Sequence, residues 1–214
     1  MLTRVELQEW FNDLGQIIFD TNISIINLQR ITQPISENEK KILSIGFFDQ
    51  FYHQSRFVII IQLCKVFDKN KNQKRNFYYL FDRLCSDTYD QEIEFLLTTN
   101  GSGLLLPSAR EDIEKTIRSF EHEINTKKKL IKKVIFSRNK LYAHSDPNTK
   151  VPLVTDNELD ILVKLSNKIY NELHYKYFVF RFGFPYAFDW KIDDILAVLS
   201  KFKMEDFERH NYWE

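Results

Sequence analysis

Apolar residues recur at intervals of three and four along most of this chain, and this spacing constrains the fold more than any other feature. The first run places its apolar side chains on one helical stripe: Leu7, Trp10, Phe11, Leu14, Ile17 and Ile18. Because one helical turn takes about 3.6 residues, such spacing predicts amphipathic helices. Only 5 Gly and 5 Pro occur in 214 residues, so few positions interrupt the pattern. We therefore expect an all-α fold.

Caps and breaks divide the pattern into separate helices. We predict helices over about 7–31, 36–68, 77–84, 91–97, 108–141 and 155–177, and a last one from about Asp189. A Ser or Thr three positions before a Glu forms a capping box at Ser36, Ser108 and Thr155. No segment rich in Gly, Pro or Ser splits the chain. Residues 1–214 are therefore predicted to form a single all-α domain, a helical bundle.

Composition narrows the classes of function. Lys+Arg and Asp+Glu are both 30, so any attraction for nucleic acid must come from a local patch. Cys64 and Cys85 are the only cysteines and are surrounded by apolar residues, so we predict no disulfide framework and no metal site. The N-terminus lacks a signal-peptide pattern, and the apolar run 57–64 is too short to span a membrane. We expect a cytoplasmic protein with no membrane contact.

The segment Arg138-Asn139-Lys140-Leu141-Tyr142-Ala143-His144 carries the most specific chemistry. Arg is always charged, and its planar fork matches phosphate oxygens. His titrates near neutral pH and can take or give a proton. RNA supplies its own nucleophile, the 2′-hydroxyl, so this set could cleave a phosphodiester without a metal or cofactor.

A run of basic residues leads into this segment. No Asp or Glu occurs from Ile124 to Ser145, and we expect Lys132, Lys133 and Lys140 to contact an RNA backbone. A purely structural explanation stays open, since cations near a helix C-terminus stabilise that end. On an unbroken helix, His144 would lie roughly 120° from Arg138. Convergence therefore needs a loosened final turn before Asp146-Pro147, or a second copy of the segment in a dimer.

Arg138, Asn139 and His144 resemble the Arg-polar-x4-His signature of HEPN domains, which are all-α modules of many bacterial defence and toxin systems. Two longer stretches are similar to the AbiU-like HEPN family of abortive-infection proteins. One is Leu63-Cys64-Lys65-Val66-Phe67-Asp68-Lys69-Asn70, and the other runs from Arg138 to Asp146. The order of the predicted helices is compatible with that family over nearly the whole chain.

The resemblance implies a HEPN-type bundle that forms a homodimer and a metal-independent endoribonuclease of a phage-defence or toxin-like system. Arg138 would bind the phosphate, His144 would transfer protons, and Asn139 would orient the phosphate or the histidine. RNA, a second copy and an antitoxin or other defence protein are the implied partners. HEPN toxins neutralised by nucleotidyltransferases carry Tyr two residues after the motif His, where this chain has Asp146. Some HEPN domains bind RNA or proteins without cleavage, so a noncatalytic module is the alternative.

Two further features have competing explanations. Aromatic residues occupy every second position from Phe178 to Trp190. They favour an extended connector that pins helices to the core or forms a dimer contact, with a stacking platform for unpaired bases as the alternative. Asp68 is expected to end its helix, with a lesser expectation that it lines the RNA cleft.

Overall fold

The computed structural model describes residues 1–69, 75–99, 109–143, 154–178, 180–184 and 191–201. Within these ranges the regular structure is helical. The elements are α1 (Arg4–Thr32), α2 (Glu37–Leu43), α3 (Gly46–Phe67), α4 (Phe77–Ser86), α5 (Gln91–Thr99), α6 (Ala109–Thr126), α7 (Lys128–Ser137), the π-helix η1 (Arg138–Ala143), α8 (Asp156–Phe178) and α9 (Asp193–Leu199). The prediction of an all-α fold is confirmed for the described ranges.

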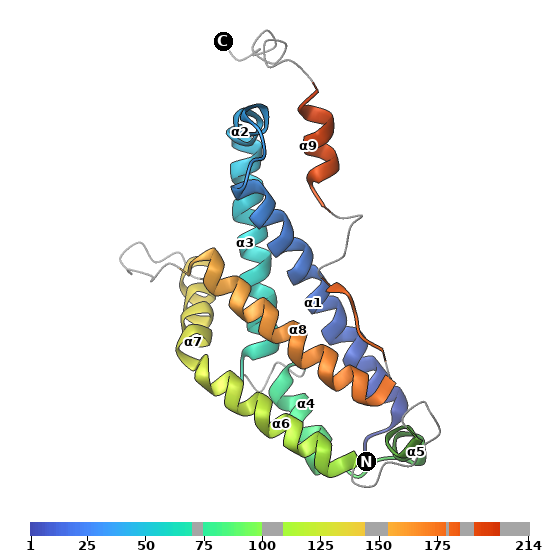
Figure 1. Ribbon diagram of the computed structural model, residues 1–214. Coiled ribbons are helices and arrows are strands. Elements are labelled where there is room, and N and C mark those ends of the chain that lie inside the picture. The colour runs from blue at the N-terminus through green and yellow to red at the C-terminus, as the bar shows by residue number, and fades with distance from the viewer. Residues whose placement is uncertain (70–74, 100–108, 144–153, 179, 185–190, 202–214) are drawn as a thin grey trace.

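The core forms where α1, α3 and α8 pack together. Figure 1 shows α1 and α3 side by side along the length of the molecule, with α8 crossing them. Helix α7 packs against α3, so the end of α7 lies beside this core. A smaller cluster of buried residues joins α1, α2 and α3 to α9: Ile31, Ile42, Phe48, Ile192 and Leu196. The apolar stripes predicted from the sequence thus face one another as a bundle requires.

Helices α1 and α8 approach closely at two polar contacts. Asn22 and Asn167 donate to each other through their side-chain amides, at 2.7 and 2.8 Å. The Tyr170 hydroxyl donates to the backbone carbonyl of Phe11 at 3.1 Å. A Cβ atom at Gly15 would lie 2.8 Å from that hydroxyl, so only glycine admits Tyr170 here. These buried contacts fix the register of the two helices.

The predicted helix over 36–68 is wrong in one respect, because it is two helices. Helix α2 ends at Leu43, and Ile45 has an extended backbone before Gly46 begins α3. The Ser44 hydroxyl donates to the carbonyl of Lys41 at 2.6 Å, a local bond that competes with helix continuation. The apolar periodicity continues across this break, so the sequence pattern did not reveal the end of α2.

The longest predicted helix, over 108–141, is also divided. Helix α6 ends at Thr126, Lys127 leaves the helical backbone with φ −96° and ψ 7°, and α7 begins at Lys128. The Thr126 hydroxyl donates to the carbonyl of Glu123 at 2.7 Å. Figure 1 shows α6 and α7 meeting at an angle at this elbow. The predicted start of this helix at Ser108 and the predicted stop signal at Asp146-Pro147 lie outside the described residues.

The aromatic segment is a connector over its described part. Phe182 is held by Asn171 of α8, whose side chain accepts from the Phe182 amide at 2.8 Å and donates to its carbonyl at 3.1 Å. The buried His174 ring bonds the carbonyl of Phe180 at 2.9 Å. The Phe182 and Phe184 rings contact Tyr170. Residues 180–184 therefore pack against α8, which agrees with the predicted connector that pins helices to the core, while residues 185–190, including Asp189 and Trp190, lie outside the described ranges.

Candidate functional site

The motif arginine begins a turn of π-helix. Helix α7 ends at Ser137, and η1 covers Arg138–Ala143. A π-helix bonds residues five apart, and single π turns occur frequently at functional sites. The buried Ser137 donates its hydroxyl to the carbonyl of Lys133 at 2.9 Å, a contact that bends helices. The helix thus changes geometry at Arg138, earlier than the loosening predicted near His144, and the α-helical angle between the two residues does not apply.

Arg138 is held by two side chains from different parts of the sequence. Its Nη2 donates to Oδ2 of Asp68 at 3.0 Å, and its Nε donates to Oδ1 of Asn139 at 3.0 Å. The Arg138 and Asp68 side chains are 26% and 17% exposed, so the ion pair is partly shielded from water. A guanidinium presents five N–H donors, and these bonds use two of them. The pair orients Arg138 and also offsets its charge.

Asp68 is the contact of Arg138 that the sequence indicated least clearly. It ends α3, where its amide donates to the carbonyl of Cys64 at 2.9 Å. The predicted role as a helix end is therefore confirmed, and the contact with Arg138 is added to it. The pair joins residues 70 positions apart. No spacing rule connects such residues; only the packing of α3 on α7 does.

Cys64 lies one helical turn before Asp68 but has no part in nucleophilic chemistry. Its side chain is buried, and burial raises the pKa of the thiol to about 12, although the Arg138 charge acts in the opposite direction. The thiolate is the reactive form of cysteine, so this thiol is inert near neutral pH. Cys64 is a small buried hydrophobe, as the sequence predicted.

The remaining predicted site residues occupy different positions. Asn139 and Lys132 are exposed, and Lys140 is half-buried. The Lys133 ammonium lies 2.7 Å from Oε2 of Glu158, so it already serves an ion pair between α7 and α8. His144 falls outside the described residues. The structure thus brings together Arg138, Asn139 and Asp68, and it leaves the role of Lys133 in RNA contact as a prediction.

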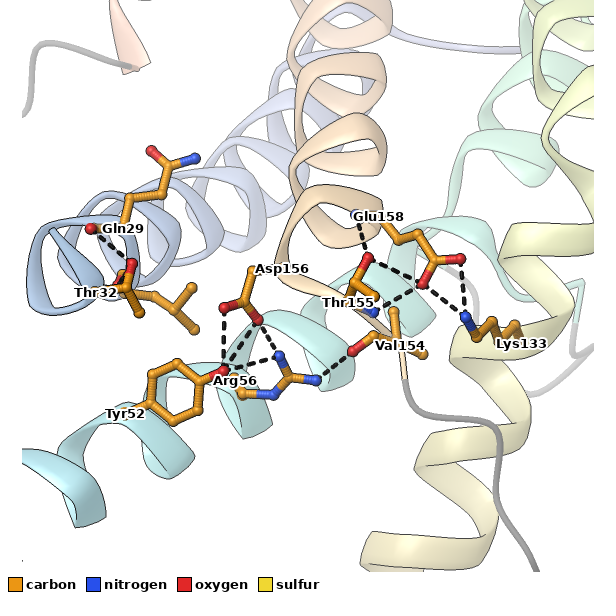
Figure 2. A network of polar contacts seen from close by, with 10 residues as sticks. Gln29, Thr32, Tyr52, Arg56, Lys133, Val154, Thr155, Asp156 and Glu158 are labelled. Atoms are coloured by element: carbon orange, nitrogen blue, oxygen red, sulfur yellow. Dashed lines mark hydrogen bonds and ion pairs between the residues drawn. The ribbon is translucent and has the colours of Figure 1, made fainter.

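A polar network fixes the start of α8, where the described chain resumes after residues 144–153. Figure 2 shows Arg56 of α3 between the Asp156 carboxylate and the carbonyl of Val154, to both of which it donates. The Tyr52 hydroxyl donates to the same carboxylate at 3.0 Å and accepts from Arg56 at 3.3 Å. Arg56 therefore clamps α3 to the first residues of α8.

The second half of that network is the predicted capping box at Thr155. The Thr155 hydroxyl accepts from the amide of Glu158 at 3.2 Å, and the Glu158 carboxylate accepts from the amide of Thr155 at 2.8 Å. Lys133 of α7 joins this network by donating to the Glu158 carboxylate (Figure 2). The Lys133 ammonium and the Thr155 amide hold the pKa of the Glu158 carboxyl below its usual value. The sequence predicted Glu158 as part of a capping box, but it did not predict the ion pair between Glu158 and Lys133.

A cavity of about 500 Å³ opens beside Asp68, between the end of α3 and the α6–α7 elbow. Its walls combine apolar side chains with lysines, among them Lys132. Asp68 belongs both to this wall and to the ion pair with Arg138. The motif arginine therefore pairs with a residue that lines a space large enough for a small organic group.

Two features are absent from the described residues. No group of three or more His, Cys, Asp and Glu side chains there lies close enough to hold a metal ion. No helix in the described ranges combines the length and apolar character needed to cross a membrane.

Comparison with known proteins identifies the fold. Residues 4–192 match the family model of the HEPN domain AbiU2, a span of well over half the chain. The chain belongs to the AbiU2 family of HEPN domains. This family is one of abortive infection, a form of phage defence, so the resemblance noted in the sequence is confirmed. Neither a curated protein nor a solved structure matches this AbiU2 chain.

Proposed function

We propose that this AbiU2 protein is a metal-independent endoribonuclease of an abortive-infection system. Arg138 binds the scissile phosphate, His144 transfers protons and Asn139 orients the arginine. The observation that carries the proposal is the Arg138 guanidinium, which is fixed by Asn139 and by Asp68, a residue that also lines a cavity. Membership of the AbiU2 family supports the defence role.

The reaction follows from the charge that develops on the phosphate. Attack by the RNA 2′-hydroxyl places additional negative charge on the phosphate oxygens, which a fixed guanidinium stabilises. One proton must leave the 2′-hydroxyl and one must reach the 5′-oxygen that departs, and an imidazole serves either transfer. The products are a 2′,3′-cyclic phosphate and a 5′-hydroxyl end. Lys132 and Lys140 contact the backbone on either side of Arg138, and Lys133 is a third such residue if RNA displaces Glu158.

The proposal includes a homodimer. A single chain supplies one imidazole from the motif, whereas two proton transfers are served best by two groups on opposite sides of the phosphate. A second copy would bring a second Arg138–His144 set to the same RNA strand. An antitoxin or another defence protein is a further candidate partner, with Asp146 at the position where some HEPN toxins have a modified Tyr.

The test is RNA cleavage by the purified full chain in EDTA. We expect cleavage to persist in EDTA, to leave 2′,3′-cyclic phosphate ends, and to fall at least about hundredfold in His144→Ala, because one positioned proton-transfer group contributes about 10²–10⁴-fold. His122→Ala is the matched control, since His122 is an exposed histidine on α6. Undiminished cleavage in His144→Ala, or an equal loss in His122→Ala, would contradict the proposal.

The Asp68–Arg138 ion pair also favours a second candidate, a noncatalytic RNA-binding module. An arginine already paired with a carboxylate has less charge to offer a transition state, yet can still contact a phosphate. This alternative predicts RNA affinity without product. Arg138→Ala would then weaken binding, while His144→Ala would leave the dissociation constant unchanged.

A further inference from the structure

The cavity beside Asp68 has the lining of a binding site for a flat, partly apolar group. Five of its wall residues are apolar or aromatic: Phe67, Tyr78, Ile124, Ile131 and Ile135. Asn125 adds a side-chain amide that can donate and accept hydrogen bonds. The volume of about 500 Å³ lies in the range of small-molecule sites. An apolar wall with a single amide suits a nucleobase, which has apolar faces and a hydrogen-bonding edge.

The charges around the cavity suit a group that is joined to phosphates. Lys69, Lys128 and Lys132 line it, and all three are exposed. Two carboxylates oppose them, Asp68 and Glu121, but Asp68 is paired with Arg138. The lysines therefore leave the rim cationic, and cations at the rim attract the phosphates of a bound nucleotide.

Tyr78 links the apolar wall to this rim. The Lys69 ammonium lies over its ring, 4.3 Å from the ring centroid, so the aromatic face holds one rim cation in place. Burial, with the Asp68 and Glu121 charges, raises the pKa of the Tyr78 hydroxyl. The hydroxyl therefore stays protonated near neutral pH and can donate to a base edge.

Asp68 links the cavity to the motif. Asp68 lines the cavity and accepts from Arg138 at 3.0 Å. Ile135 of α7 also lines the cavity and lies three positions before Arg138 in the sequence. A base seated in the cavity would thus place its own phosphate within reach of the Arg138 guanidinium.

We propose that this cavity binds one unpaired nucleobase of an RNA strand, next to the phosphate that Arg138 holds. The inference rests on the proposed function and adds the substrate class, single-stranded RNA with a base preference beside the cleaved bond. Asn125 and Tyr78 read the edge of the base, and Lys69, Lys128 and Lys132 bind the flanking phosphates. A neighbouring cavity of about 910 Å³ is less suited, because Asp82, Glu114 and Glu121 line it against two cations, Lys69 and Arg118.

The first test blocks the cavity without touching the core. Asn125 is exposed and lines the cavity, so Asn125→Trp places a large ring in that space. The matched control is Ser119→Trp, at an exposed position on α6 outside the cavity lining. Binding is measured with a 2′-O-methyl oligoribonucleotide, which cannot be cleaved. We expect Asn125→Trp to raise Kd at least about tenfold and Ser119→Trp to leave it unchanged; equal Kd values for the two variants would overturn the proposal.

The second test reverses one rim charge. We expect Lys132→Glu to weaken oligonucleotide binding at low salt and to reduce the slope of log Kd against log salt, because phosphate contacts release counterions. Lys115→Glu carries the same charge change at an exposed position of α6 away from the cavity. Thermal unfolding confirms that each variant is folded. Identical salt slopes for the two variants would reject the rim lysines as phosphate contacts.

A third arm separates RNA from free nucleotides and separates this inference from the proposed function. The four nucleoside 5′-monophosphates are titrated against the oligonucleotide complex. We expect the oligonucleotide to bind at least about tenfold more tightly than any of them, since it adds the flanking phosphates; equal or tighter binding of a mononucleotide would overturn the RNA assignment. If the wild-type chain binds RNA, Asn125→Trp weakens that binding and no cleavage occurs, the endoribonuclease proposal is rejected and the nucleobase site is supported. If the wild type cleaves RNA and Asn125→Trp cleaves every sequence equally well, the nucleobase site is rejected and the endoribonuclease proposal is retained.

Discussion

Two arginine–aspartate pairs flank the segment that contains His144, and they differ in how the arginine is used. Arg56 donates to Asp156, to the Tyr52 hydroxyl and to the carbonyl of Val154. Arg138 donates to Asp68 and to its own neighbour Asn139. The Arg56 side chain is 15% exposed and the Arg138 side chain 26%. Residue type and pairing are the same, but among the described residues Arg56 joins a carboxylate, a hydroxyl and a backbone carbonyl, whereas Arg138 joins a carboxylate and the Asn139 side chain.

This difference separates a structural arginine from a functional candidate. Arg56 satisfies groups of α3 and the start of α8, so its loss would leave several polar atoms without their partner. Within the described ranges Arg138 pairs with the distant carboxylate of Asp68, which lines a cavity, so a phosphate could share or replace that carboxylate. An arginine–aspartate pair therefore indicates a functional arginine only when the other contacts of the guanidinium are also taken into account.

The largest expected effect is on cleavage by Arg138→Lys. Lysine keeps the charge but lacks the planar fork that binds two oxygens at once. We expect kcat/KM for RNA to fall by about hundredfold, the size of effect seen when one transition-state donor is lost. Arg56→Lys is the control, with cleavage within about threefold of wild type. Equal activity in the two variants would remove the distinction between the pairs.

Next in size is the effect of Arg56→Ala on stability. Removing one partner of a shielded ion pair costs about 3 kcal/mol, and the free energy of unfolding should fall by that amount. For a chain of this length the midpoint would drop by roughly 6–12 °C, measured by circular dichroism. Arg118→Ala provides the comparison, because that side chain is 73% exposed and should change stability by less than about 1 kcal/mol. A change below about 1 kcal/mol in Arg56→Ala would show that the clamp is dispensable.

A smaller effect is expected from Asp68→Asn. Asparagine keeps an acceptor for Arg138 and removes the negative charge that offsets it. We expect Kd for a 2′-O-methyl oligonucleotide to fall about fivefold, corresponding to about 1 kcal/mol for a partly exposed pair. Asp82→Asn, at an exposed aspartate of α4 away from Arg138, is the control. Weaker binding in Asp68→Asn would mean that orientation of the guanidinium outweighs its charge.

The smallest effect concerns acid stability through Glu158. Its pKa is lowered in the folded state, so its contribution is complete above the usual value of 4.5 and is lost as pH falls through the lowered pKa. Glu158→Gln should therefore reduce the free energy of unfolding by about 1 kcal/mol at pH 7, and the difference should disappear in acid. Urea unfolding from pH 7 to pH 3 measures this difference, with Glu9→Gln at an exposed position of α1 as control. A difference that stays constant over this range would exclude the linkage.

The helical architecture could be predicted because apolar spacing directly encodes which face of a helix is buried. The Thr155–Glu158 capping box could also be predicted because its two residues are close in sequence, and both of its hydrogen bonds are present in the structure. The breaks at Ile45 and Lys127 were missed because the apolar pattern continues across them, whereas a hydroxyl bond to the backbone competes with each helix locally. Local rules therefore predicted the elements better than their interruptions.

The candidate site could be predicted only in part. Arg138 and Asn139 were found because they adjoin in sequence and the motif has a recognisable spacing. The contacts of Arg138 with Asp68 and of Lys133 with Glu158 were not, because each depends on how separate helices pack. The cavity was missed for the same reason, since α3, α4, α6 and α7 all contribute to its wall.

The elbow at Lys127 has a consequence for the evolution and engineering of this chain. Helix α7 runs ten residues from that elbow to Ser137, so its length sets the direction in which Arg138 leaves the bundle. One inserted or deleted residue would rotate the arginine by about 100° relative to α6. Substitutions within α7 are thus far easier to accommodate than a change in its length.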